Sequence, residues 1–325
     1  MKEKIKYAGA MLICFIAVLF IRMPVMADDG VPETAWRDNA ATDFAGGSGT
    51  EADPYQITDG AQLAKIAKDV ENGTVYKDAY FRLENDIDLS AHRWNPIGVY
   101  KWYEGGATED RMFAGFLDGN GKTITGLIVD ERTEKNRAGL FGQIAYTGAA
   151  TNVGVKDLNI VDARIYATNE GMEKNSSAIL AGFVMANSGH TIRFDDISVS
   201  GTIVNTKVGD NSMMSGGLFG EANRVTADHC RADVTIEGGD NTGGFVGLDG
   251  SSTYTNCKVT GKVTGLWAIG GFVGYAWEAE SATMSTYDNC IAKVDVVANE
   301  WRAGGFAGYM QKGKSSSCAA LGDVT

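Results

Sequence analysis

The sequence predicts an all-β protein: a right-handed parallel β-helix, or solenoid, with a short N-terminal capping helix. The first observation behind this prediction is a short Gly–Phe or Gly–Leu–Phe element that occurs six times. Its successive phenylalanines stand 42, 36, 26, 27 and 34 positions apart. Repeats with periods of roughly 20–50 residues indicate stacked supersecondary units. The six copies begin at Gly139, Ala181, Gly217, Gly244, Gly271 and Gly305.

The second observation is a strand-like alternation that accompanies the repeats. In five segments every second residue is apolar or small, and the residues between are mostly polar, which predicts strands with one buried and one solvated face. Because the inward order is the same in all five, equivalent positions are expected to stack in successive coils, each buried against its neighbours. The inward sets are Ile197, Val199, Gly201, Ile203; Cys230, Ala232, Val234, Ile236; Cys257, Val259, Gly261, Val263; Cys290, Ala292, Val294, Val296; and Cys318, Ala320, Gly322, Val324.

The first 27 residues are typical of a bacterial secretory signal peptide. Three lysines within the first six residues precede an apolar run from Tyr7 to Ile21, and small residues follow near Ala27. An uncleaved membrane anchor is the alternative, although the apolar run is shorter than a membrane span usually requires. Residues 28–50 are expected to form a flexible linker, because they end in a Gly- and Ser-rich stretch.

Residues 51–115 are predicted to form an N-terminal cap and the first coil. A helix is expected between Asp59, which with Gln62 resembles a capping box, and Gly73. Such a helix would cover the open end of the solenoid. Its apolar face comprises Leu63, Ile66, Ala67 and Val70, and a strand follows with Phe81, Leu83, Ile87 and Leu89 on one face.

Residues 116–325 are expected to be the β-helix repeats. The final strand, Cys318–Val324, has the pattern of an interior coil rather than of a polar cap. We therefore expect the natural protein to continue past Thr325 with further repeats, a cap, and a wall anchor or a catalytic domain.

Several segments resemble the opening of secreted bacterial β-helix proteins: Phe44–Thr50, Asp53–Ile57, Asp86–Leu89, Trp94–Gly98 and Phe116–Gly121. The Gly-Leu/Phe-Phe/Val-Gly repeats resemble the GLUG motif of bacterial surface proteins, which include regions of IgA-specific metallopeptidases. The resemblance covers nearly all of the chain from Ala45 to Thr325. It implies an architecture and a surface location, but such motifs do not define a function.

Composition and motifs exclude several functions. The formal net charge is −12, and because the first 27 residues carry +3, the remainder carries −15, which argues against nucleic acid or an anionic membrane as a partner beyond signal-peptide targeting. None of the three histidines begins the His-Glu-x-x-His motif of a zinc peptidase. The row Glu84, Asp86 and Asp88 is interpreted as a solvated strand face in preference to a cation or lyase site. No cofactor, metal or catalytic residue is predicted.

Four cysteines occupy the same inward position in successive repeats: Cys230, Cys257, Cys290 and Cys318. Their register favours buried free thiols that pack as small hydrophobic side chains. A disulfide ladder or a metal site, which an oxidising compartment would permit, is the alternative.

The best binding candidates are aromatic. Trp267 and Trp301 both stand five residues before the phenylalanine of their repeat, and Tyr275 and Tyr309 both stand three residues after it. Because equivalent positions stack, these four side chains are predicted to form one exposed patch on the last two coils, suited to a sugar or a partner protein. Trp102, in a loop after the first strand, is a second candidate. A purely structural aromatic ladder is the alternative.

Together these features predict a non-catalytic secreted or cell-surface protein, an adhesin-like stalk or a binding surface for a host protein or glycan. Two alternatives remain open. One is the non-catalytic N-terminal region of a large secreted zinc peptidase of the IgA-protease type, as the resemblance implies. The other is a β-helix enzyme that cleaves polysaccharides.

Overall fold

The computed structural model describes residues 30–102, 108–133, 136–145, 152–168, 174–206, 212–277 and 284–325. The chain divides into two units, Met1–Gly30 and Val31–Thr325, and the fold below is that of the second unit. The predicted signal peptide, residues 1–27, lies outside the described residues. Within the described ranges, no helix is long and apolar enough to cross a membrane.

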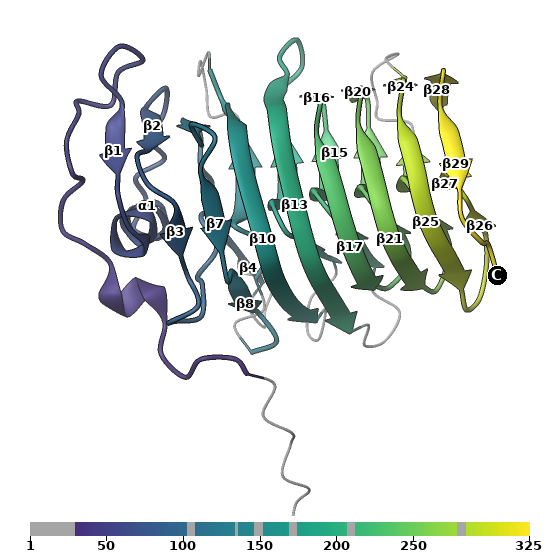
Figure 1. Cartoon of the computed structure of the whole chain (residues 1–325), viewed down its shortest axis with the longest axis horizontal. Helices are drawn as coiled ribbons and strands as arrows, with labels where there is room; N and C mark the ends of the chain where they lie inside the picture. The colour runs from purple at the N-terminus through teal and green to yellow at the C-terminus, as the bar shows by residue number, and fades with distance from the viewer. Residues whose placement is uncertain are drawn as a thin grey trace, which may run out of the picture. The chain divides into compact units, whose positions relative to one another are not determined.

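The unit is a parallel β-helix, as the sequence predicts (Figure 1). Each strand of one coil pairs in parallel with its equivalent in the next coil. The coil is wound from three sheets, so the apolar faces of all three enclose a common core. The long face of the first sheet is formed by β10 (Gly154–Thr168), β13 (Ile192–Thr206), β17 (Arg231–Glu237), β21 (Lys258–Gly265), β25 (Ile291–Ala298) and β29 (Ala319–Leu321).

The same sheet continues around a corner with shorter strands. These are β1 (Tyr55–Ile57), β2 (Tyr80–Leu83), β6 (Phe116–Asp118), β16 (Val225–Asp228), β20 (Thr253–Thr255), β24 (Ser285–Asp288) and β28 (Gly313–Ser316). In the first coils the long face is extended by β3 (Ile87–Asp88), β7 (Thr123–Thr125) and β8 (Ile128–Asp130). At the corner, polar residues such as His229, Asn256 and Asn289 adopt the left-handed backbone conformation. Asn256 donates to Asp228 Oδ1 (3.0 Å) and Asn289 donates to Asn256 Oδ1 (2.7 Å), so the corner side chains link successive coils.

Two smaller parallel sheets complete the coil. One contains β11 (Lys174–Ala178), β14 (Ser212–Gly216), β18 (Asn241–Gly243), β22 (Ala268–Gly270) and β26 (Ala303–Gly304). The other contains β9 (Phe141–Ala145), β12 (Ala181–Met185), β15 (Phe219–Asn223), β19 (Val246–Gly250), β23 (Val273–Trp277) and β27 (Ala307–Met310). Among the named strands that the structure describes, β4 (Val99–Trp102) and β5 (Thr108–Arg111) alone pair in antiparallel fashion.

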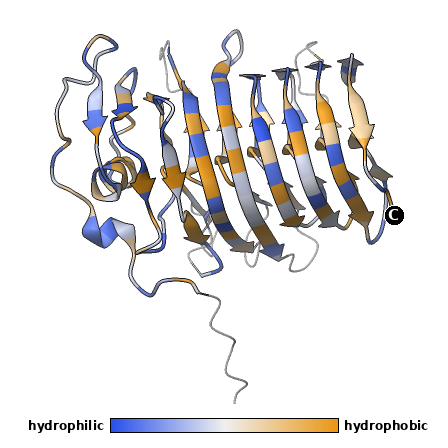
Figure 2. Cartoon of the chain, in the orientation of Figure 1, coloured by the Kyte–Doolittle hydropathy of each residue, from blue (hydrophilic) through white to orange (hydrophobic). Residues whose placement is uncertain are grey.

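The inward register predicted for the long face is confirmed for β13, β17, β21 and β25, whereas Ala320 and Val324 of the fifth predicted set are exposed. Val199, Ala232, Val259 and Ala292 pair in one ladder and are all buried. The alternation of apolar and polar residues along these strands is visible in Figure 2. Equivalent positions therefore do stack, and the core of each coil is completed by its neighbours.

A sixth long strand, β10, belongs to the same set. Leu158, Ile160 and Ile165 pair with Ile197, Val199 and Ile203 of β13, but the register shifts between Ile160 and Ala163. Asp162 lies in this shift with φ of 56°. The extra residue of such a β-bulge interrupts the period of two, so the alternation rule does not find this strand.

The phenylalanines that follow the glycines fill the coil interior. Phe245 stacks on Phe272 at a centroid distance of 4.6 Å, and Phe272 stacks on Phe306 at 5.0 Å. Phe219 lies 6.1 Å from Phe245 and is shifted by one residue, since it pairs with Val246. Phe306 is only partly buried, because it belongs to the last coil.

The second repeat copy departs from the expected alignment. Ala181, and not Phe183, pairs with both Phe141 and Phe219, so the copy is displaced by two residues. The Phe183 ring instead lies 3.7 Å from the Arg137 guanidinium, which covers it. A Gly–Phe pair therefore does not by itself fix the register of a coil.

The capping helix is confirmed as α1 (Gly60–Glu71), which lies beside the first coils (Figure 1). The Asp59 carboxylate accepts a hydrogen bond from Gln62 N (2.9 Å), which satisfies one free amide of the first turn. The side chain of Gln62 accepts in turn from Thr58 N (2.7 Å). The helix buries Leu63, Ile66, Ala67 and Val70, and the predicted inward residues Phe81, Leu83, Ile87 and Leu89 are buried too.

The segment expected to be a flexible linker is packed against the first coil from Val31 onward. It contains the short 3-10 helix η1 (Trp36–Asn39), and Trp36 Nε1 donates to Leu89 O (2.9 Å). Ala35 is 2% exposed and forms a bridge with Arg93, and Gly46 forms another with Gln56. Glycine content suggested flexibility here, but the tryptophan anchors the segment to the cap.

Candidate functional site

The structure brings together three of the four aromatic residues predicted for the last two coils. Tyr275 of β23 pairs with Tyr309 of β27, and their rings stack at 4.9 Å. The Trp267 ring, in the turn before β22, meets both tyrosines edge-on at 5.9 and 6.0 Å. We call Trp267, Tyr275, Tyr309 and the adjoining Arg302 the aromatic patch.

Arg302 is the member that sequence reasoning missed. Its guanidinium lies 4.4 Å from the Trp267 ring centroid and 4.0 Å from that of Tyr309, within the range of cation–π attraction. The only sequence signal was its position next to Trp301, which carries little information. Arg302 places a fixed positive charge over the rings of an otherwise acidic chain.

The polar rim of the patch includes the Tyr275 hydroxyl and the Gln311 side chain. Tyr275 Oη donates to Gln311 Oε1 (2.7 Å). Partial burial and the neighbouring Tyr309 raise the pKa of Tyr275, so its hydroxyl is a neutral donor at physiological pH. All three rings are half-buried, with one side packed on the coil.

The other two predicted binding residues stand apart from the patch. Trp301 is 65% exposed, and within the described ranges its ring contacts none of the three patch rings. Its backbone amide donates to Leu266 O (3.0 Å), which places it on the edge of the same two coils. Trp102 ends β4, but its side chain lies outside what the structure describes.

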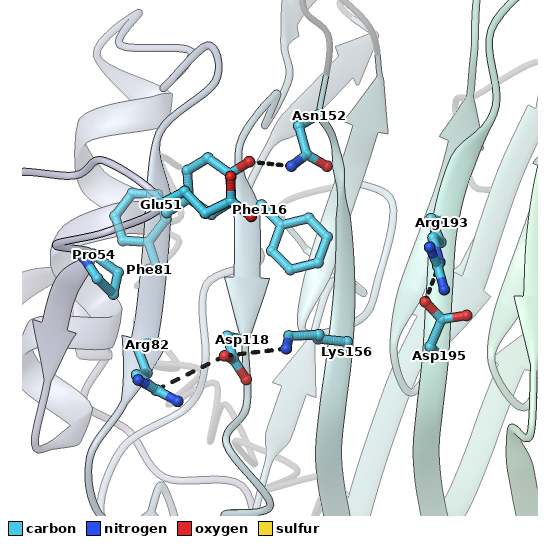
Figure 3. Close-up of a pocket in the computed structure, with 11 residues that line it drawn as sticks. Glu51, Pro54, Phe81, Arg82, Phe116, Asp118, Asn152, Lys156, Arg193 and Asp195 are labelled. Carbon is cyan, nitrogen blue, oxygen red and sulfur yellow. Dashed lines mark hydrogen bonds and ion pairs between the residues drawn. The ribbon is translucent and has the colours of Figure 1, made fainter.

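A second candidate surface is a groove of about 520 Å³ on the outer face of the first coils (Figure 3). Its apolar part includes the Tyr80 and Phe116 rings, whose centroids lie 5.7 Å apart on the paired strands β2 and β6. The Tyr80 hydroxyl is hydrogen-bonded to Asn152 at the side of the groove. Glu51 and Pro54 line the groove as well.

A row of charged residues crosses the groove. Arg82, Asp118, Lys156 and Asp195 occupy paired positions on β2, β6, β10 and β13. Asp118 Oδ2 lies 3.4 Å from Lys156 Nζ and 3.8 Å from Arg82 Nε, and Asp195 is paired with Arg193. Figure 3 shows these side chains in line across neighbouring strands.

The pKa shifts in the row reflect this packing. Burial lowers the pKa of Lys156, but the Asp118 and Asp157 carboxylates outweigh it and raise the pKa overall. Burial also raises the pKa of Asp195, against the opposing effect of Arg193. Sequence reasoning missed the groove because its residues come from separate coils and meet only once the coil register is known.

The four cysteines form one column across successive coils, as their shared register predicts, and no disulfide joins them in the structure. Cys230, Cys257 and Cys290 are buried, and Cys318 is half-buried in the last coil. Each thiol lies within hydrogen-bonding distance of a backbone carbonyl of its own corner, such as Thr255 O for Cys257 Sγ (3.2 Å), and of a carbonyl of the preceding coil, such as Ala227 O (3.5 Å). Burial raises the pKa of the Cys257 thiol, which disfavours the reactive thiolate.

The acidic row of the first coil behaves as a solvated face. Asp86 and Asp88 are exposed, and each accepts a hydrogen bond from a nearby backbone amide, Thr123 N (2.8 Å) and Ser90 N (2.9 Å). The bond from Ser90 lowers the pKa of Asp88. In the part of the chain that the structure describes, no group of three or more His, Cys, Asp or Glu residues could hold a metal ion.

Comparison with known proteins supports the fold and a repeat character. The chain matches none of the protein families against which it was compared. It is 29% identical over 191 residues to a halomucin of Haloquadratum walsbyi, and 31% identical over 150 residues to a candidate Gly-rich membrane protein of Evansella cellulosilytica. These matches cover 57% and 44% of the chain but only 2% and 15% of the two relatives.

The fold is also similar to that of a solved structure. This is a candidate immunoglobulin A1 protease of Bacteroides ovatus, with a TM-score of 0.55 and 18% sequence identity. The alignment covers 85% of the chain and 77% of the solved one. At this identity the likeness establishes the shared architecture alone.

Proposed function

We propose that this chain is a non-catalytic, extracellular repeat module that binds a partner protein through the aromatic patch. The observation that carries the proposal is the cluster of Trp267, Tyr275 and Tyr309 with Arg302 on the outer side of the last coils. Trp, Tyr and Arg are the residue types most enriched at the energetic centres of protein interfaces.

The geometry favours a protein partner over a sugar at this patch. A sugar ring stacks on the open face of an aromatic ring, but the Arg302 guanidinium already lies over Trp267 and Tyr309. The cation and the ring edges remain available to carboxylates, carbonyls and apolar side chains, which are the groups a protein surface offers.

An extracellular location is supported by two independent features. The first 27 residues have the composition of a secretory signal peptide. The relatives at the sequence level are a halomucin and a candidate Gly-rich membrane protein. A GLUG-type surface protein of adhesin character is consistent with both.

A second candidate function rests on the solved structure. Because the fold is similar to that of a candidate immunoglobulin A1 protease, the chain would serve as the N-terminal non-catalytic region of a large secreted zinc peptidase. A His-Glu-x-x-His motif encoded downstream of Thr325 in the gene would support this function, and a gene without one would exclude it. Release of reducing ends from polysaccharides by the purified chain would contradict the non-catalytic proposal.

The partner class can be tested on epithelial cells with the fluorescently labelled chain and flow cytometry. We expect saturable binding that trypsin treatment of the cells abolishes and that removal of surface glycans leaves in place. Purified immunoglobulin A1 serves as a first defined protein probe. Binding that survives trypsin but disappears after glycosidase treatment would contradict a protein partner, and so would absence of binding to both cells and immunoglobulin.

A further inference from the structure

The groove on the first coils is a surface separate from the aromatic patch. We propose that it is a separate binding site for a neutral oligosaccharide segment. It lies on β2, β6, β10 and β13, whereas the aromatic patch lies on the coils of β22, β23, β26 and β27. The two sites therefore share no residue.

Charge balance is the first argument for a neutral ligand. The groove is lined by three cations and three carboxylates: Arg82, Lys156, Arg193, Glu51, Asp118 and Asp195. Two of the carboxylates already lie beside cations, so the groove offers no excess charge for an anionic or cationic chain. A charged ligand would also leave one of these groups without its ion-pair partner.

Hydrogen-bonding complementarity is the second argument. A sugar hydroxyl donates and accepts at once, and the row alternates donors with acceptors in the order Arg82, Asp118, Lys156, Asp195. Arg82 Nε is screened from solvent without a hydrogen-bond partner among the described residues, and its nearest carboxylate oxygen lies 3.8 Å away. A ligand hydroxyl oxygen would satisfy that donor once the Arg82 side chain, which is 43% exposed, turns toward the groove.

Shape is the third argument. Neighbouring strands are about 4.8 Å apart, so the row spans about 14 Å from Arg82 to Asp195, which suits several linked sugars better than one. The Tyr80 and Phe116 rings form an apolar strip beside the row. Aromatic side chains in such a position contact the C–H face of a sugar while the charged row binds its hydroxyls.

Isothermal titration calorimetry of the purified chain with a panel of neutral hexaoses from glucan, mannan, xylan and galactan tests the proposal, with hexagalacturonate as the anionic probe. We expect at least one neutral hexaose to bind, and to bind at least about tenfold more tightly than hexagalacturonate. Absence of binding by every neutral hexaose, or a preference for hexagalacturonate, would overturn the proposal.

The variant Asp118→Asn tests the groove itself. It keeps the shape of the side chain but leaves Arg82 and Lys156 unbalanced, so neutral binding should weaken by about tenfold and hexagalacturonate binding should strengthen. Asp233→Asn on β17, also on an outward face, is the matched control and should change neither. Unchanged affinities in Asp118→Asn would place any sugar elsewhere.

The proposals for the two sites can be tested independently of each other. Tyr309→Ala should leave hexaose binding unchanged, because the aromatic patch does not line the groove. Tyr80→Ala should weaken hexaose binding and leave cell binding unchanged. If Tyr80→Ala does not fold, as judged by circular dichroism, Lys156→Met replaces it, since this side chain is 40% exposed.

Discussion

Asp249 carries an ionisable side chain in the interior of the β-helix. It is a fully buried carboxyl group on β19, and it accepts hydrogen bonds from Tyr254 Oη (2.9 Å) and Tyr287 Oη (2.6 Å). The two tyrosine rings are buried and stack at 5.3 Å, so their hydroxyls can reach no solvent. Asp249 satisfies both hydroxyls, which explains a carboxyl group at an interior position.

This carboxyl group should make stability depend on pH. Burial raises the pKa of Asp249, so the folded state holds its proton at pH values where the unfolded chain has released it. The stabilising contribution is therefore complete below the unfolded pKa of about 3.9 and is lost as the pH rises through the folded pKa. The measurement is the difference in unfolding free energy between wild type and Asp249→Asn from pH 3 upward. As the pH rises, the wild type should lose stability relative to Asp249→Asn. A difference that stays constant with pH would contradict the raised pKa of Asp249.

Trp301 should separate binding from folding. Its side chain is 65% exposed, so Trp301→Ala should leave the thermal midpoint unchanged within about 1 °C, as is usual for surface substitutions. If the partner surface extends from the aromatic patch to this edge, affinity for epithelial cells should fall by about 2 kcal/mol or more. A loss of stability of that size without a loss of affinity would instead assign Trp301 to the coil structure.

At the scale of single strands, one backbone position alternates between glycine and a larger residue from coil to coil. Gly201, Gly261 and Gly322 have positive φ, and they pair with or adjoin Ala163, Val234 and Val294. A Cβ on Gly261 would lie 1.9 Å from Val234 O of the neighbouring coil. The alternation therefore reflects a close approach of two backbones.

Gly261→Ala should consequently be costly. The backbone contact and the positive φ of 121° act together, so we expect a loss of about 3 kcal/mol or more. Gly73→Ala is the control, because Gly73 also has positive φ (99°) but no atom within 4 Å of its would-be Cβ, and it should cost about 1 kcal/mol. Thermal midpoints measure both. Equal losses would show that φ alone matters.

The cysteine column should behave as a graded set of thiols. Denatured without reductant, the chain from residue 28 onward should yield four free thiols, since Cys14 lies in the predicted signal peptide. In the native state Cys318 should react first with a thiol reagent, because it is half-buried and the other three are buried. Recovery of fewer than four thiols would indicate the disulfide alternative.

Sequence patterns predicted the elements that obey one simple period. The alternation of β13, β17, β21 and β25 and the apolar face of α1 needed no further information. The alternation rule did not find β10, because a bulge interrupts its period of two. The alignment predicted for Phe183 was wrong, because a Gly–Phe pair does not define which residues pair between coils. The aromatic patch followed from equal offsets in two repeats, whereas Arg302 and the groove needed the packed coils.

At the scale of the whole molecule, the side chains that a partner could reach point outward from a continuous core. The inward residues of one coil stack on those of the next, so they vary little in type. The outward rows are free to differ, and they carry charged groups over β2 to β13 and aromatic groups over β23 and β27. Such a stack presents separate surfaces without altering its core.

The aromatic patch is the surface that we propose binds a protein partner. The most direct measurement is the affinity for epithelial cells of Tyr309→Ala beside that of Tyr166→Ala, since Tyr166 also lies under an arginine, Arg132, at 4.8 Å but outside the patch. Tyr309→Ala should weaken binding by about 2 kcal/mol, roughly thirtyfold, and Tyr166→Ala should not change it. Equal affinities for wild type and both variants would contradict the claim.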